Sequence, residues 1–178
     1  MKYLFFLLLV AISCKKQDTS SNPVTYTIGQ STGGGKVFYI YGTGEHVLIG
    51  ALNDQSISAE FWDAGSHIQT NATSSTDGLA NTNTIISVIG NSGTYAAKIC
   101  KDYRGGGFSD WFLPSYDQLQ TMYTQRITVF GGGFSYNYWS STEASPIYNN
   151  VIGFDFQNGV QLIQNRFAKS WVRAIRAF

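Results

Sequence analysis

Side chains that could carry out enzyme chemistry are sparse in this chain. The two cysteines, Cys14 and Cys100, are too far apart for a C-x-x-C pair, and neither His46 nor His67 belongs to an H-E-x-x-H pattern. A catalytic thiol at Cys100 would need one of these two histidines as its base, so Cys100 is better interpreted as a buried core thiol. We therefore predict no catalytic residues, no metal site and no cofactor.

Aromatic and amide side chains around the segment Y-W-S-S-T-E (138–143) are better candidates for contacts with a ligand. Tyrosine rings stack on sugar faces and bury area at little entropic cost, while the asparagine amide forms hydrogen bonds with hydroxyl groups. We expect these groups on exposed loops and strand ends, with ordinary turn composition as the alternative explanation. The predicted ligand-binding residues are Tyr136, Asn137, Tyr138, Glu143, Tyr148, Asn149 and Asn150.

A second group of polar and aromatic residues is better explained by the fold. Only 13% of the chain is charged. In such a domain an aspartate beside a tryptophan, and an arginine on an inward strand face, usually form buried, hydrogen-bonded pairs. This structural role is predicted for Asp110, Trp111, Trp139 and Arg173, and Glu143 could belong to either group.

The N-terminus has the features of an export signal. Lys2 precedes an apolar run over residues 3–12, which is too short to span a bilayer, where roughly 20 residues are needed. Ser13 and Cys14 follow directly and resemble the lipobox of bacterial lipoproteins. The resemblance implies cleavage before Cys14 and lipidation of Cys14, which gives stable membrane anchoring. An ordinary secretory peptide followed by a chance cysteine is the alternative.

These features divide the chain into three parts. Residues 1–13 are a lipoprotein signal peptide, residues 14–23 a lipidated polar tether, and residues 24–178 one domain. Loss of Lys2 with the signal leaves 11 basic and 11 acidic side chains. A formal net charge of zero gives no global field for nucleic acid, so no nucleic-acid partner is expected.

The hydrophobic pattern predicts a domain with strands at both ends and helices in the middle. Two helices are predicted, over 93–103 and after Ser115, where Gln118 completes a capping box; residues 81–84 could cap a further helical stretch. An irregular segment is expected over 53–77. Strands are predicted over 25–28, 36–41, 46–52, 138–142, 150–156, 160–167 and 170–178, with a turn at Gly33, Gly34 and Gly35 and a hairpin at Asn158 and Gly159. This order indicates an α+β fold with a mostly antiparallel sheet and long irregular loops.

Five segments occur in an order typical of a known family. They are D-G-L-A-N-T-N (77–83), A-A-K-I-C-K-D-Y (96–103), G-G-F-S-D-W-F-L-P-S (106–115), Y-W-S-S-T-E (138–143) and V-R-A-I-R-A-F (172–178). Together they resemble the C-terminal domain of the Legionella collagen-like adhesin, over roughly residues 33–178. The resemblance implies a C-type-lectin-like fold in which the chain ends pair, and, for the adhesin, binding of sulfated glycosaminoglycans. This chain lacks the collagen-like repeats, the basic excess and the calcium-binding W-N-D and E-P-N motifs.

The function expected from the sequence is that of a binding module. The lipid anchor places it in the cell envelope, attached to the outer membrane on the periplasmic or the surface-exposed side, where an adhesin-like domain would recognise a glycan or a protein. The alternative is a structural or assembly subunit of an envelope complex, and an enzyme is the least favoured class.

Replacing Cys14 with alanine tests the anchor. Because the acyl chains and the cleavage both depend on this thiol, Cys14→Ala is expected to accumulate as uncleaved precursor without lipid. Mass spectrometry of the purified protein and membrane fractionation measure both effects. Normal processing and membrane retention of the variant would contradict the lipoprotein interpretation.

Overall fold

The computed structural model describes residues 24–62, 69–134, 136–145 and 149–178. The predicted signal peptide and tether lie outside these ranges. None of the helices in the described part is long and apolar enough to cross a lipid bilayer.

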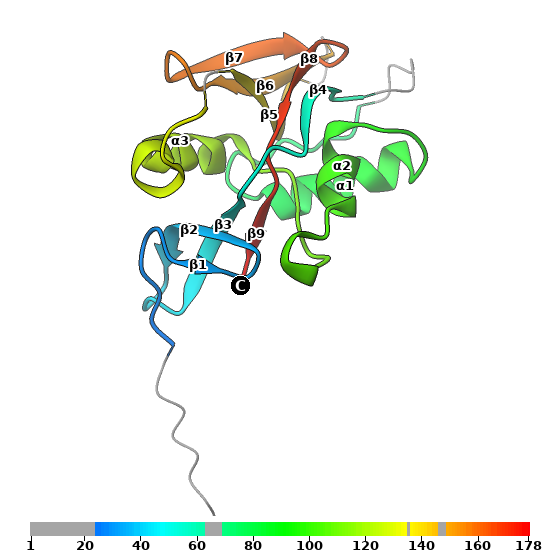
Figure 1. Ribbon diagram of the computed structural model, residues 1–178. Coiled ribbons are helices and arrows are strands. Elements are labelled where there is room, and N and C mark those ends of the chain that lie inside the picture. Colours follow the sequence, from blue (N-terminus) through cyan, green and yellow to red (C-terminus); the bar gives the residue numbers. More distant parts are fainter. Residues whose placement is uncertain (1–23, 63–68, 135, 146–148) are drawn as a thin grey trace, which may run out of the picture.

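The fold is α+β, as predicted, with two sheets stacked one above the other in Figure 1. The first sheet is antiparallel and has the order β1 (Ser31–Thr32), β2 (Gly35–Tyr41), β3 (His46–Ala51) and β9 (Ile175–Ala177). The second has the order β4 (Ser56–Glu60), β8 (Lys169–Val172), β5 (Asn137–Ser145), β6 (Asn150–Asp155) and β7 (Val160–Asn165). Only the short β5–β8 pairing is parallel. The last strand of the chain thus pairs within the sheet that contains the first strand.

Three α-helices flank the sheets in the described residues, where two had been expected. They are α1 (Gly78–Ile89), α2 (Ala96–Asp102) and α3 (Tyr116–Phe130), with a short 3-10 turn at η1 (Gly105–Gly107). Helix α1 begins earlier than predicted because Asp77, not the 81–84 segment, caps it through the amide of Ala80. The predicted capping box is confirmed: Ser115 and Gln118 satisfy each other's backbone amides at the start of α3.

Two chain segments cross side by side from one sheet to the other. The single strand predicted over 170–178 is wrong in this respect: it is divided into β8 and β9, which belong to different sheets. Opposite the break, the segment between β3 and β4 makes the same crossing (Figure 1). Backbone bonds join the two segments, from the Ala51 amide to the Ala174 carbonyl (3.0 Å) and from the Gln55 amide to the Val172 carbonyl (2.9 Å).

Arg173 ties these crossings together from a buried position. Its Nε donates to the Asp54 carboxylate at 2.7 Å, and its Nη1 donates to the carbonyls of Ala51 and Leu52 at 3.1 and 3.2 Å. The guanidinium also lies 4.4 Å from the ring centroid of Phe134. The structural role predicted for Arg173 is therefore confirmed.

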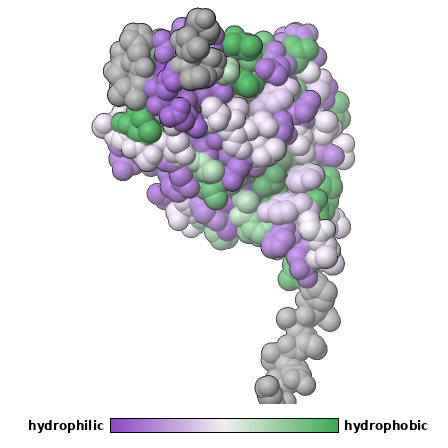
Figure 2. Space-filling view, turned by 180° about the vertical axis from the view of Figure 1, so that it is seen from behind, coloured by the Kyte–Doolittle hydropathy of each residue, from purple (hydrophilic) through white to green (hydrophobic). Residues whose placement is uncertain are grey.

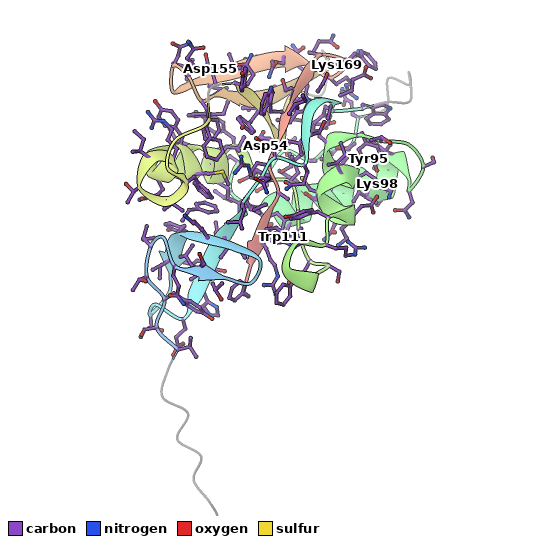
Figure 3. All side chains as sticks on the ribbon, viewed as in Figure 1. Asp54, Tyr95, Lys98, Trp111, Asp155 and Lys169 are labelled. Atoms are coloured by element: carbon purple, nitrogen blue, oxygen red, sulfur yellow. The ribbon has the colours of Figure 1, made fainter. Side chains whose placement is uncertain are left out.

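Tryptophans anchor the core beside these crossings. Trp111 is fully buried, donates to the Gly105 carbonyl at 3.1 Å and lies among the sheets and helices (Figure 3). Trp139 is also fully buried and donates to the Ala59 carbonyl at 2.8 Å. Cys100 is the buried thiol that was expected, and burial raises its pKa well above the usual value. These predictions are confirmed.

Asp110 only partly follows its prediction. It forms an ion pair with Arg176, but its side chain is half exposed rather than buried. Arg176 lies between the rings of Phe108 and Phe178, at 3.8 and 4.5 Å from their centroids, so the aromatic contacts bury the arginine rather than the aspartate.

Local predictions near the N-terminus need two corrections. Residues 25–28 form no strand; the edge strand is β1, which pairs with β2. The segment 53–77 is not wholly irregular, because it contains β4. The glycine string before β2 does form a turn, and its composition reflects a close backbone contact: a Cβ on Gly34 would lie 2.6 Å from the Gly105 carbonyl oxygen.

The surface is mixed rather than dominated by one apolar area. The face shown in Figure 2 is largely hydrophilic, with hydrophobic side chains in separate groups. Isolated apolar residues of this kind are normal on a protein surface.

Removing the Trp111 side chain tests the core. Trp111→Ala should lower the free energy of unfolding by about 3–5 kcal/mol, because the deletion loses buried area and leaves a cavity. Urea unfolding followed by circular dichroism measures this, with Trp111→Phe as a control that should cost less. A loss below about 1 kcal/mol would show that Trp111 is not part of a packed core.

Candidate functional site

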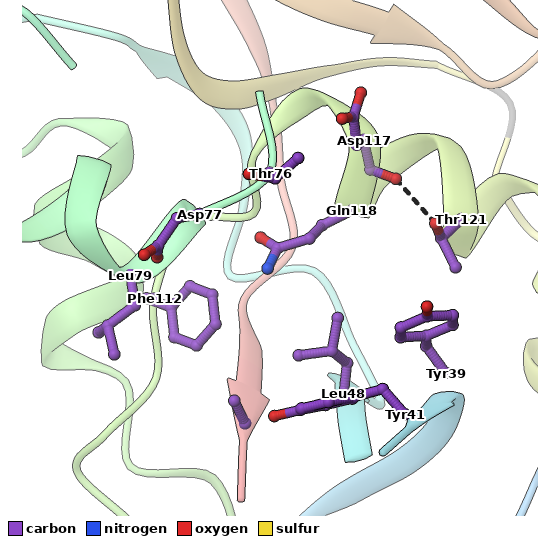
Figure 4. Close-up of a pocket in the computed structure, with 11 residues that line it drawn as sticks. Tyr39, Tyr41, Leu48, Thr76, Asp77, Leu79, Phe112, Asp117, Gln118 and Thr121 are labelled. Carbon is purple, nitrogen blue, oxygen red and sulfur yellow. Dashed lines mark hydrogen bonds between the residues drawn. The ribbon is translucent and has the colours of Figure 1, made fainter. Parts of the chain in front are cut away.

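A cleft of about 520 Å³ opens between the first sheet and the beginnings of two helices. Residues of β2, β3 and β9 line one side, and residues at the starts of α1 and α3 line the other (Figure 4). Its volume falls in the range of about 300–1,000 Å³ that is usual for small-molecule sites.

The sheet side of the cleft carries exposed tyrosines. In β2, Ile40 packs against the core beside its partner Val47, so Tyr39 and Tyr41 lie on the opposite face of the strand, where they line the cleft. These tyrosines are 44% and 37% exposed. Their ring centroids are 6.0 Å apart with planes inclined by 16°, and His46 continues the row at 5.4 Å from Tyr41. Exposed, near-parallel aromatic rings are suited to stacking against a flat ligand.

The helix side of the cleft carries polar groups. Asp77 is the N-cap of α1, and Asp117 and Gln118 lie in the first turn of α3. The Gln118 side chain points from α3 toward Phe112 and Asp77, and the Thr121 hydroxyl donates to the Asp117 backbone carbonyl at 2.8 Å (Figure 4). Helix starts favour acidic residues, so the local rules of α1 and α3 explain why both aspartates occur at these positions.

Each of the two carboxylates uses one oxygen for the fold. Asp77 Oδ1 accepts from the Ala80 amide at 2.9 Å, and Asp117 Oδ2 accepts from the Ser75 hydroxyl at 2.9 Å. Asp77 Oδ2 and Asp117 Oδ1 accept no hydrogen bond from the part of the chain that the structure describes. Both carboxylates are therefore held in place by the fold, and in Figure 4 the Asp117 carboxylate points away from Tyr39 and Tyr41.

The residues predicted to bind a ligand do not line this cleft. Tyr136 is half exposed and stacks on Trp171, with ring centroids 4.0 Å apart and planes 7° apart. Asn137 is exposed at the start of β5, while Asn149 and Asn150 are partly exposed beside and in β6. Tyr148 lies outside the described residues.

The expected exposure of Tyr138 is wrong. Tyr138 is fully buried in β5, where its ring packs against Phe134 and Phe156. Burial and the nearby Asp54 carboxylate raise the pKa of its hydroxyl above the ordinary value. Both faces of β5 are covered at this point, because Trp139 and Ser140 are buried as well, so the strand has no exposed face on which Tyr138 could lie.

Glu143 is also buried, and its contacts are structural. Its carboxylate accepts hydrogen bonds from the backbone amides of Thr70 and Asn71, with shortest distances of 3.2 and 3.0 Å. Arg166, itself fully buried, lies 3.9 Å from the same carboxylate. Glu143 therefore joins β5 to the chain that precedes α1 and is not available on the surface.

Other chemistry-bearing patterns do not form a site. Residues 29–33 have the G-x-S-x-G spacing of a nucleophile elbow, but Ser31 lies in β1 at the sheet edge and not at a strand-to-helix turn. No group of three or more His, Cys, Asp or Glu side chains within the described ranges is placed to hold a metal ion.

Comparison with known proteins found no match: no family model matches the chain, and no curated protein matches it.

Changing Glu143 to glutamine tests its structural role. Glu143→Gln keeps the shape of the side chain but replaces the charged carboxylate with a neutral amide, which weakens the hydrogen bonds from the backbone amides of Thr70 and Asn71. The free energy of unfolding, measured by urea titration, should therefore fall by about 1–3 kcal/mol. The matched control is the exposed Glu45, where Glu45→Gln should stay within about 0.5 kcal/mol of the wild type. Equal effects of the two changes would contradict a structural role for Glu143.

Proposed function

We propose that this protein is a carbohydrate-binding module of the cell envelope, held at the outer membrane by lipid on Cys14. The cleft between β2 and the starts of α1 and α3 is the proposed binding site. The observation that carries the proposal is the pair of exposed, near-parallel rings of Tyr39 and Tyr41 on the sheet side of this cleft.

The chemistry of the two sides matches the two aspects of a sugar ring. A sugar presents C–H groups on its faces and hydroxyl groups around its edge. Aromatic rings contact the faces, and carboxylate and amide groups accept and donate hydrogen bonds at the edge. Apolar side chains of Leu48 and Phe112 complete the lining and exclude water from the contact.

The framework around the cleft supports binding without a large rearrangement. Gln118 Oε1 is held by the Ser115 amide at 2.9 Å, and Asp77 and Asp117 are held by the bonds described above. Side chains fixed before binding lose less conformational entropy when a ligand arrives, and more of the contact energy then appears as affinity.

Removing the two tyrosine rings tests the site. The double variant Tyr39→Ala, Tyr41→Ala should bind an oligosaccharide selected on a glycan array about tenfold more weakly or worse, because it loses the contacts of both rings with the sugar. A tenfold loss corresponds to about 1.4 kcal/mol. Isothermal titration calorimetry measures the loss, and circular dichroism checks the fold. Tyr136→Ala is the matched control, since Tyr136 is another exposed tyrosine outside the cleft.

Two results would overturn the proposal. If the wild type retains no glycan, the carbohydrate function is wrong, and co-purification of a fixed protein partner would then favour an assembly subunit. If Tyr136→Ala abolishes binding and the β2 double variant does not, the ligand binds near β5 instead of in the cleft.

A further inference from the structure

We infer that β7 is the contact surface between two copies of this chain, which pair their β7 strands antiparallel about a two-fold axis and so join their second sheets. The inference goes beyond the carbohydrate function and does not depend on it, because no residue of β7 lines the cleft. It is carried by the open backbone groups of β7, by the exposed apolar side chains on this strand and by its lack of charged residues.

The edge of the second sheet at β7 is long, regular and open. β7 pairs with β6 over all of its six residues without a bulge, and no strand of the described chain lies on its other side. In Figure 1 it forms the outer border of the sheet, at the end of the molecule remote from residue 24. Val160 and Ile163 are 49% and 64% exposed. An edge strand of this kind is a template for pairing with another chain.

The other edges of the two described sheets have features that oppose such pairing, and β7 has none of them. β1 is two residues long, while β9 is three residues long, carries Arg176 and is bridged to Phe112 on its outer side. β4 carries Glu60, and its register with β8 is irregular between Ser56 and Ala59. Short strands, charges and bulges are the usual protection of an edge. β7, with the sequence V-Q-L-I-Q-N, has no charge, no proline and no bulge.

The hydrogen bonds to β6 identify which backbone groups of β7 are open. Just beyond the two strands, the Arg166 amide donates to the Asn149 carbonyl at 2.9 Å. Because direction alternates along an antiparallel ladder, the even-numbered residues of β7 turn their amides and carbonyls to β6 and the odd-numbered residues turn theirs outward. Of the outward residues, Asn165 already accepts at its carbonyl from the amide three residues on, at 2.9 Å. The open groups are therefore those of Gln161 and Ile163.

These open groups fit a second copy of the same strand. In the two-fold register that uses them alone, Gln161 of one copy lies opposite Ile163 of the other, and each such pair exchanges two backbone hydrogen bonds. Leu162 then lies opposite Leu162 of the second copy on the axis, and Val160 lies opposite Gln164. Every facing pair is uncharged, so pairing brings no like charges together. Because both copies use the same patch, the contact closes as a dimer.

A second copy fits this edge better than a strand of another protein. Domains that bind foreign peptides at a sheet edge take their specificity from side-chain pockets beside it. The clefts of about 520, 380 and 380 Å³ on this molecule are lined by no residue of β7. A foreign strand would therefore gain backbone bonds without selection of its side chains, whereas a second copy supplies a matching uncharged row with leucine against leucine.

Pairing through β7 leaves the carbohydrate cleft open. The cleft lies between the first sheet and the starts of α1 and α3, whereas β7 belongs to the second sheet. A dimer therefore presents two clefts. A carbohydrate with repeated units that reaches both is bound more tightly than by one cleft, because its second binding event is intramolecular.

Disulfide trapping in cells that produce the full chain tests the pairing. Leu162→Cys places two thiols opposite each other on the axis, at a spacing that a disulfide spans after small adjustments. Gln161→Cys is the matched control: Gln161 is the more exposed residue, but its two copies lie on the order of 8 Å apart between Cα atoms, beyond the reach of a disulfide. After oxidation with diamide, Leu162→Cys should give about fivefold more linked dimer on a non-reducing gel than Gln161→Cys. The wild type controls for Cys14 and Cys100.

A charge on the edge tests whether strand pairing produces the cross-link. Ile163→Lys changes an exposed edge position, so the monomer keeps its fold, while in the dimer the two added charges lie diagonally across the axis. In the Leu162→Cys background this change should lower the yield of linked dimer about fivefold or more. Ile57→Lys, at a 66% exposed position of β4 on the other edge of the same sheet, is the matched control and should leave the yield unchanged. Circular dichroism checks the fold of each variant.

Several results would overturn the dimer. Equal yields from Leu162→Cys and Gln161→Cys would mean random collision, and no linked dimer from Leu162→Cys would mean that the strands do not pair. A yield that Ile163→Lys leaves unchanged would place the contact elsewhere, and an adduct with the mass of a different protein would show that a foreign strand occupies the edge. None of these results bears on the carbohydrate function, which the Tyr39→Ala, Tyr41→Ala variant tests separately.

Discussion

The buried ion pair between Arg173 and Asp54 holds together the two segments on which the architecture depends. Both segments cross from one sheet to the other, and the arginine also donates to the carbonyls of Ala51 and Leu52. A buried pair of this kind adds little over well-packed apolar residues, but removing one partner costs about 3–5 kcal/mol because a charge is left uncompensated. Its main effect is therefore to specify where each crossing lies relative to the other.

The position of the cleft follows from these crossings. Once β9 has left the crossing, it pairs with β3, and the segment before α3 joins it through two backbone bonds between Phe112 and Ile175, of 2.9 and 3.0 Å. The first turn of α3 is thereby placed opposite the outer face of β2. Tyrosines from one sheet and residues from two helix starts line one cleft because distant parts of the chain are joined here.

Features set by local interactions could be predicted from the sequence, and features set by the joining of distant segments could not. Neighbouring residues determine the capping box at Ser115 and the hairpin turn at Gly159. The burial of Trp111 follows from the size of its apolar surface. The division of the last strand has no signal in the sequence, because the break at Arg173 and Ala174 contains neither glycine nor proline. In the same way, Tyr39 and Tyr138 look equivalent in sequence, yet one faces solvent and the other the core.

The use of arginine by the fold determines what the surface can recognise. Arg166, Arg173 and Arg176 are all buried, and each faces a carboxylate: Glu143 and Asp54 lie in the interior, while Asp110 is half exposed. These three cations therefore serve the fold and do not form a basic surface. The aspartates that remain at the cleft are those required at helix starts, where the helix dipole compensates them only in part. Recognition of a sulfated ligand would have to use basic residues other than these three, such as the exposed Arg104 and Lys169.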